Sequence, residues 1–129
     1  MNSQSSQVQR ITVLGSTGSI GVNTLDVISR HLGRFEVFAL TGATQVDLMF
    51  QQCLQFKPTL VVMAQADAAK HLQEKLDAQG LRTQVQSGAK ALEEVAAHPL
   101  VDCVMAAIVG AAGLKACIAA AISGKRLLL

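Results

Sequence analysis

The stretch that decides the fold of this chain reads ITVLGSTGSIG and runs from Ile11 to Gly21. It begins with an apolar run of the kind that forms a buried strand. Three glycines then follow at a regular spacing, at Gly15, Gly18 and Gly21. Beyond them, apolar residues recur at helical spacing, at Leu25, Ile28 and Leu32. The stretch therefore predicts a strand, a glycine-rich turn and a helix, the unit from which parallel α/β sheets are built.

Strand and helix patterns alternate in the same way over the rest of the chain. Besides the first strand at 10–15, we expect strands at 35–40, 59–63, 83–86, 102–109 and 125–129. Between them, apolar residues at helical spacing form three sets: Val46, Met49, Phe50, Cys53 and Leu54; Ala69, Leu72 and Leu76; and Leu114, Cys117, Ile118, Ala121 and Ile122. A further short helix is expected at 90–97. Six strands with five intervening helices predict an α/β domain, a Rossmann-like doubly wound parallel sheet with helices on both faces.

The composition limits what this chain binds. With 129 residues, 50% of them hydrophobic, it is long enough for one domain with a real core. The formal net charge is only +2, Lys and Arg are not clustered, and Trp and Tyr are absent, so we expect no nucleic-acid partner. The cysteines lack metal-binding or disulfide spacing. We expect all three to be small buried apolar residues of a cytoplasmic protein: Cys53, Cys103 and Cys117.

Two segments bear on targeting and on membranes. Residues 1–9 are polar and lack the basic and apolar regions of a signal peptide, so we expect a disordered tail before a domain spanning 10–129. The apolar stretch Val104–Ile122 is nearly long enough to cross a bilayer. However, Lys115 lies in its middle, where a charge costs about 2.5–3.5 kcal/mol. We therefore expect a buried strand followed by a buried helix, and no membrane partner.

The position of the glycines favours a phosphate-binding role. A dinucleotide pyrophosphate binds between the first strand and the first helix of a Rossmann unit. Glycine allows positive φ and close approach of backbone N–H groups, and the helix adds unpaired N–H groups and its positive dipole end. Thr17 and Ser19 add hydroxyl donors. The spacing is G-x-x-G-x-x-G, one residue longer than the commonest fingerprint, and the Gly-Lys-Ser/Thr of a P-loop is absent. A glycine-rich turn without a ligand is the alternative.

The end of the second strand bears on which dinucleotide binds. NAD enzymes usually carry Asp or Glu there, which binds the ribose 2′-OH. Here Leu40 is followed by Thr-Gly-Ala-Thr-Gln, and the first acid is Asp47. A carboxylate at this position would repel a 2′-phosphate, and this chain has none there. Thr44 and Gln45 can also hydrogen-bond a 2′-phosphate, so we favour NADPH.

A third segment, AAIVGAAG, follows the fifth strand. At the carboxyl end of a strand, beside the switch point, small residues leave room for a nicotinamide ribose. We expect Ala107 and Ile108 to lie near it. Tight packing of a helix on the sheet would account for the same small residues, and the two interpretations are compatible.

Three segments taken together resemble one enzyme family. They read TVLGSTGSIGVNTLDVI, VMAAIVGAAGL and SGKRLLL, and the similarity runs from about Arg10 to Leu129. The chain resembles the 1-deoxy-D-xylulose 5-phosphate reductoisomerase family, which are NADPH- and metal-dependent oxidoreductases of isoprenoid precursor synthesis. The resemblance implies that the substrate is rearranged to a branched aldehyde, which NADPH reduces to 2-C-methyl-D-erythritol 4-phosphate.

The resemblance also implies which residues bind NADPH. Gly15 turns the chain at the cofactor, and the next residues bind the pyrophosphate and neighbouring groups: Thr17, Gly18, Ser19 and Ile20. The 2′-phosphate is read at the positions of Ala43, Thr44 and Gln45. Many members carry Gly, then Lys, Arg or Ser, then Asn at those three positions, so this chain departs from the pattern there. The nicotinamide side is lined by Ala107 and Ile108.

Other features of the family are absent from this sequence. An Ala-Asn-Lys-Glu run, the carboxylates that hold Mg or Mn, the site for the phosphosugar substrate and a C-terminal helical domain would all follow Leu129. We therefore expect the N-terminal NADPH-binding portion of such an enzyme, with no catalytic residue and no metal ligand, inactive alone. The three histidines are expected on the surface: His31, His71 and His98.

The resemblance further implies a homodimer for the full-length enzyme. The apolar last strand predicts that the fragment alone associates with itself. Two alternatives stay open at this point. The chain could be the cofactor domain of another NAD(P) reductase, or a free-standing nucleotide-sensing module.

Overall fold

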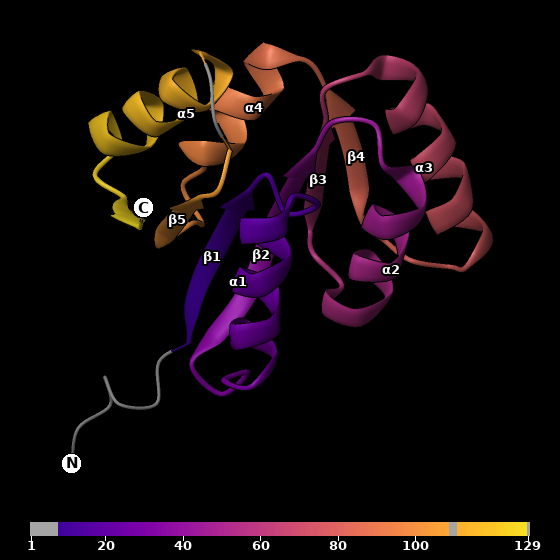
Figure 1. The fold of residues 1–129 in the computed structure, drawn as a ribbon, viewed down its shortest axis with the longest axis horizontal. Coiled ribbons are helices and arrows are strands. Elements are labelled where there is room, and N and C mark those ends of the chain that lie inside the picture. The colour runs from indigo at the N-terminus through magenta and orange to yellow at the C-terminus, as the bar shows by residue number, and fades with distance from the viewer. Residues whose placement is uncertain (1–7, 109–110, 129) are drawn as a thin grey trace.

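The computed structural model describes residues 8–108 and 111–128. All its strands are parallel and form one six-stranded sheet in the order β4-β3-β2-β1-β5-β6 (Figure 1). The strands are β1 (Gln9–Leu14), β2 (Phe35–Gly42), β3 (Leu60–Met63), β4 (Gln84–Ser87), β5 (Cys103–Ala106) and β6 (Arg126–Leu128). The helices are α1 (Ser19–Ser29), α2 (Val46–Phe56), α3 (Ala66–Ala78), α4 (Ala89–Ala96) and α5 (Ala111–Ile122). The predicted Rossmann-like doubly wound sheet is confirmed.

Helices cover both faces of the sheet, and each face has its own core. On one face the buried residues of α1, α2 and α3 pack together, at Leu25, Ile28, Met49, Cys53, Ala69, Leu72 and Leu76. On the other face the buried residues come from α4 and α5, at Ala91, Leu92, Val95, Ala96, Ala116 and Ala120. Alternate residues of β1 serve the two cores, because successive side chains of a strand point to opposite faces.

The sheet reverses direction beside β1. The chain proceeds outward from β1 through β2 and β3 to the edge strand β4, and α4 then returns it across the sheet to β5, on the other side of β1 (Figure 1). Ala107 N donates a 2.9 Å hydrogen bond to Leu14 O, which extends the β1–β5 pairing one residue beyond the end of β5. In open α/β sheets such a switch point is where ligands bind, outside the carboxyl ends of the strands.

Two helical faces differ from the prediction. Helix α1 ends at Ser29, so Leu32 lies beyond it and is 60% exposed. In α5 the predicted residues Ile118 and Ile122 are 50% and 82% exposed, whereas the small residues Ala116 and Ala120 are buried. The expectation of a fully buried helix there is wrong. The reason is the close approach of α5 to the preceding turn, where a Cβ on Gly113 would lie 2.7 Å from Ile108 Cγ2.

Some predictions fall on residues outside the described ranges. These are the tail at residues 1–7, Val109 of the fifth strand, Leu129 of the sixth, and the side chain of Leu114. Gln9, which was expected to end the tail, begins β1. The apolar stretch Val104–Ile122 contains most of β5 and all of α5. Within the described part of the chain, every helix is too short or too polar to cross a membrane.

A buried hydroxyl in β1 offers a test of the packing. Thr12 is fully buried in the middle of β1, and its Oγ1 has no hydrogen-bond partner among the described residues. An unpaired buried polar group costs about 1–3 kcal/mol. We therefore expect Thr12→Val, which keeps the shape and removes the hydroxyl, to raise the free energy of unfolding by about 1 kcal/mol. Urea denaturation measures this, and a lower unfolding free energy for the variant would contradict it.

Candidate cofactor-binding site

The glycine loop joins β1 to α1 in a fixed conformation. Gly15 has φ +80, a conformation that side chains rarely adopt. Its N–H donates a 2.8 Å hydrogen bond to Thr41 Oγ1, and Ser16 N donates one of the same length to Thr41 O. A Cβ on Gly21 would lie 2.1 Å from Gly15 O, so α1 packs directly on the loop. The first and third glycines are thus required by the fold itself.

The middle glycine is arranged differently. Gly18 is exposed at the N-cap of α1, and a Cβ on it would meet only Gly15 O, at 3.8 Å. No side chain caps this end of α1, and its first turn has no acidic residue. The unpaired N–H groups and the positive end of the helix dipole are therefore available to an anion. Gly18 is the glycine whose absence of a side chain keeps this approach open.

The two hydroxyl residues between the first glycines point in different directions. Thr17 is half-buried and lines a cavity, whereas Ser16 is fully buried and pairs with Gln52 of α2. Ser16 Oγ donates to Gln52 Oε1 at 2.7 Å, and Gln52 Nε2 donates to Ser16 O at 2.9 Å. Neither Gln52 nor Thr41 was predicted, because no local motif links them to the loop.

A cavity of about 470 Å³ lies at the carboxyl ends of the strands. Six of the predicted site residues line it: Gly15, Thr17, Gly18, Ala43, Ala107 and Ile108. Four do not, since Ser19, Ile20, Thr44 and Gln45 are exposed outside its lining. The remaining lining residues were not predicted: Thr41, Gly42, Val62, Ala64, Gly88, Ala89 and Leu92. Thr41, Gly42 and Val62 lie in the last residues of β2 and β3, and Ala64 and Gly88 directly follow β3 and β4, so their position at the end of a strand was the available signal.

The segment between β2 and α2 has the features expected of a 2′-phosphate site only in part. Gln45 is the N-cap of α2 and makes no side-chain cap hydrogen bond, so the helix end is open to an anion. Asp47 lies in the first turn of α2, but its carboxylate is 3.7 Å from Lys75 Nζ of α3. Because that carboxylate has a cationic partner, it opposes an anion at Thr44 and Gln45 less than a free one would.

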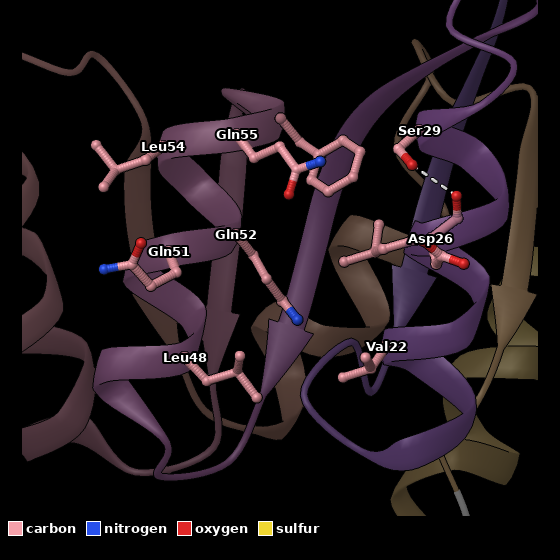
Figure 2. A pocket seen from close by; sticks show the side chains of 10 residues that line it. Val22, Asp26, Ser29, Leu48, Gln51, Gln52, Leu54 and Gln55 are labelled. Carbon is pink, nitrogen blue, oxygen red and sulfur yellow. Dashed lines mark hydrogen bonds between the residues drawn. The ribbon is translucent and has the colours of Figure 1, made fainter.

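A second cavity, of about 480 Å³, forms a groove between α1 and α2 and shares no lining residue with the first (Figure 2). Asp26 on its α1 side is paired with Arg30 at 2.5 Å, and both side chains are exposed. Figure 2 shows Gln52 extending from α2 into the space between the two helices. The groove therefore lies on the face of the sheet that α1, α2 and α3 cover, and Gln52 connects it to Ser16 of the glycine loop.

The other titratable residues form no second site in the parts of the chain that are described. Burial raises the pKa of the Cys53 thiol to about 12 and also raises that of Cys103, so both stay protonated at neutral pH. Cys117 is half-buried, short of the full burial expected. Over residues 8–108 and 111–128, no three His, Cys, Asp or Glu residues are grouped to hold a metal ion.

One histidine differs from its prediction as a surface residue. His31 and His71 are exposed, but His98 is half-buried against Phe38, with ring centroids 4.7 Å apart. Its Nδ1 accepts a 3.1 Å hydrogen bond from Leu100 N. His98 therefore has a structural role in the turn after α4.

The sheet order, the glycine loop and the cavity at the switch point place this chain in the class of Rossmann-like α/β domains. The sequence profile of 1-deoxy-D-xylulose 5-phosphate reductoisomerase matches residues 11–129. The chain belongs to that family.

Individual relatives agree with this assignment. The 1-deoxy-D-xylulose 5-phosphate reductoisomerase of Methylobacillus flagellatus is 61% identical over 122 residues, which are 95% of this chain and 30% of the relative. That of Janthinobacterium sp. (strain Marseille) is 60% identical over 122 residues, 95% of this chain and 31% of the relative. This chain thus spans about 30% of the length of the curated relatives it matches.

Solved structures of the family have the same fold. A DOX-P reductoisomerase in complex with NADPH, fosmidomycin and magnesium superposes with a TM-score of 0.90 at 43% identity, over 95% of this chain and 30% of that one. The enzyme from Zymomonas mobilis in complex with NADPH gives 0.86 at 40% identity, over 94% of this chain and 31% of that one.

Proposed function

We propose that this chain is the NADPH-binding part of an enzyme that converts 1-deoxy-D-xylulose 5-phosphate to 2-C-methyl-D-erythritol 4-phosphate. The observation that carries the proposal is the cavity at the ends of β1, β2 and β5, bordered by the uncapped start of α1. Family membership supports it, and related structures are complexes with NADPH. NADPH, when bound, supplies the hydride for the reduction.

The residues present fit a dinucleotide along the strand ends. Thr17 and Gly18 lie where the start of α1 would receive the pyrophosphate. Ala107 and Ile108 border the cavity after β5, and we assign them to the nicotinamide side. Ala43 borders it after β2, on the adenosine side. The remaining predicted residues would contact the cofactor at the rim of the cavity. They are Ser19 and Ile20 in the first turn of α1, and Thr44 and Gln45 beside the cavity.

The 2′-phosphate distinguishes NADPH from NADH, and calorimetry on this chain tests the assignment. One hydrogen bond from Thr44 or Gln45 to a charged phosphate contributes about 1.5 kcal/mol, so we expect NADPH to bind about tenfold or more tightly than NADH. Gln45→Glu places a carboxylate at this point and is expected to abolish the preference. Gln51→Glu, an exposed site on the same helix, is the matched control. Equal affinities of the unmodified chain for the two dinucleotides would contradict the assignment.

The remaining chemistry of the enzyme is proposed to lie on parts of the relatives that this chain does not match. We assign no residue of this chain to catalysis or to a metal, and we place the phosphosugar substrate and the Mg or Mn ion on those other parts. One related structure is a complex with magnesium, and another contains fosmidomycin as well. A cytoplasmic homodimer is our proposal for the whole enzyme, and we expect this chain alone to bind NADPH without turning over substrate.

A further inference from the structure

Three of the five buried polar side chains in the described ranges surround the glycine loop. They are Ser16, Thr41 and Gln52, of which Gln52 is only 7% exposed. Thr41, at the end of β2, accepts from the loop amides of Gly15 and Ser16. Gln52, from α2, pairs with both the side chain and the carbonyl of Ser16. The loop is thus anchored from β2 and from α2 at adjacent residues.

The pairing with Gln52 requires a carboxamide. Its Oε1 accepts from Ser16 Oγ at 2.7 Å while its Nε2 donates to Ser16 O at 2.9 Å. A carboxylate of the same size has no N–H to donate to the carbonyl, and an apolar side chain can make neither bond. Because the site is buried, a carbonyl left without its donor has no ready replacement from solvent.

The anchored carbonyl sets the direction of the next amide. In a planar trans peptide the C=O and the following N–H point in opposite directions. Gln52 holds Ser16 O toward α2, on the face of the sheet that α1, α2 and α3 cover. The N–H of Thr17 must then point the other way, toward the strand-end cavity that Thr17 lines. Among residues 8–108 and 111–128, no acceptor is hydrogen-bonded to this N–H.

We propose that Gln52 is a positioning residue for the cofactor loop: by holding Ser16 O, it directs the Thr17 N–H at the pyrophosphate. This inference rests on the proposed NADPH site. Gln52 lines the groove between α1 and α2 and does not line the cofactor cavity, so it acts on the ligand through the loop alone (Figure 2).

The first test compares ligands with and without a pyrophosphate. We expect Gln52→Met to raise the Kd for NADPH about tenfold at a temperature where the variant is fully folded, while the Kd for 2′-AMP, which has no pyrophosphate, changes less than twofold. Gln55→Met is the control, since Gln55 is exposed and lines the same groove three residues along α2. An equal loss of affinity for NADPH and 2′-AMP, or an unchanged affinity for NADPH, would overturn the proposal.

The second test needs no ligand. In Gln52→Met, hydrogen exchange at the Gly15 and Ser16 amides is expected to quicken about tenfold, while exchange at Val13 and Leu40 in the adjoining strands stays the same. Unchanged exchange in the loop would refute the positioning role, whatever the measured affinity for NADPH. If exchange in the loop quickens but the unmodified chain binds no NADPH, Gln52 anchors the loop as argued, whereas its role toward the pyrophosphate and the proposed function both fail. If Gln52→Met does not fold, Gln52→Asn, whose amide is one methylene shorter, is expected to show the same changes.

Discussion

Gly21→Ala is expected to lower the free energy of unfolding by about 3 kcal/mol or more, or to prevent folding. The added Cβ would lie 2.1 Å from Gly15 O, 2.6 Å from Ser16 Cα and 2.8 Å from Ser16 C. All three are backbone atoms of a loop that hydrogen bonds to Thr41 hold in place. Overpacking of a well-packed site costs about 1–3 kcal/mol and sometimes more, and a contact with fixed backbone belongs at the upper end.

Two other glycines provide the controls for this measurement. Gly18→Ala adds a Cβ that would lie 3.8 Å from Gly15 O, and Gly33→Ala adds one with nothing within 4 Å. We expect both variants to unfold within about 1 kcal/mol of the unmodified chain in urea. If Gly21→Ala were as stable as these two, the close packing of α1 on the glycine loop would be wrong.

Thr17→Asp is expected to reduce the affinity for NADPH about a thousandfold. Thr17 lines the cavity beside the uncapped start of α1, so the new carboxylate would face the proposed pyrophosphate. Two like charges 4 Å apart repel by about 4 kcal/mol at an effective dielectric constant of about 20, which is about three powers of ten in Kd. Calorimetric titration of the variant with NADPH measures the loss.

Thr17→Asn separates the charge from the change of shape, because asparagine has the size of aspartate and no charge. We expect this variant to lose no more than about tenfold in NADPH affinity, the equivalent of one hydrogen bond. Thermal unfolding of both variants shows whether they are folded at the titration temperature. Equal losses in the two variants would remove electrostatic repulsion as the cause, and unchanged affinity in Thr17→Asp would move the pyrophosphate away from this loop.

The sequence predicted the sheet well because most of its strands contain short apolar runs separated by clear breaks, whereas the edge strand β4, which reads QVQS, is largely polar and exposed. Helix α2 shows where periodicity is reliable, since Met49 and Cys53 are both buried as predicted. Helix α5 shows where it fails. This helix is apolar nearly all round, so spacing alone does not select a face. The close approach of α5 to Ile108 selects the small residues Ala116 and Ala120, and the larger Ile118 and Ile122 are left outside.

The candidate site was predictable where it has a local signal. Glycine spacing identified the loop, the end of a strand identified Ala107 and Ile108, and the family resemblance added Ala43. Ala64, Gly88 and Ala89 line the same cavity, but they carry no functional group that would indicate a binding role in the sequence. Gln52 is separated from Ser16 by 36 residues, and only the packing of α2 against the loop brings the two together.

The order of the strands has a consequence for how the chain acquires its fold during synthesis. The first four strands and α1, α2 and α3 can assemble as soon as residue 87 is available, because their pairings are between neighbours in sequence. One side of that half-built sheet, with Leu14, Phe38 and Val62, then has no cover until α4 and α5 are made. The central strand β1 also waits for β5, since Ile11 pairs with Cys103. The growing chain therefore passes through a stage in which a wide apolar surface faces water, and this is the stage at which it is most exposed to aggregation and to capture by chaperones.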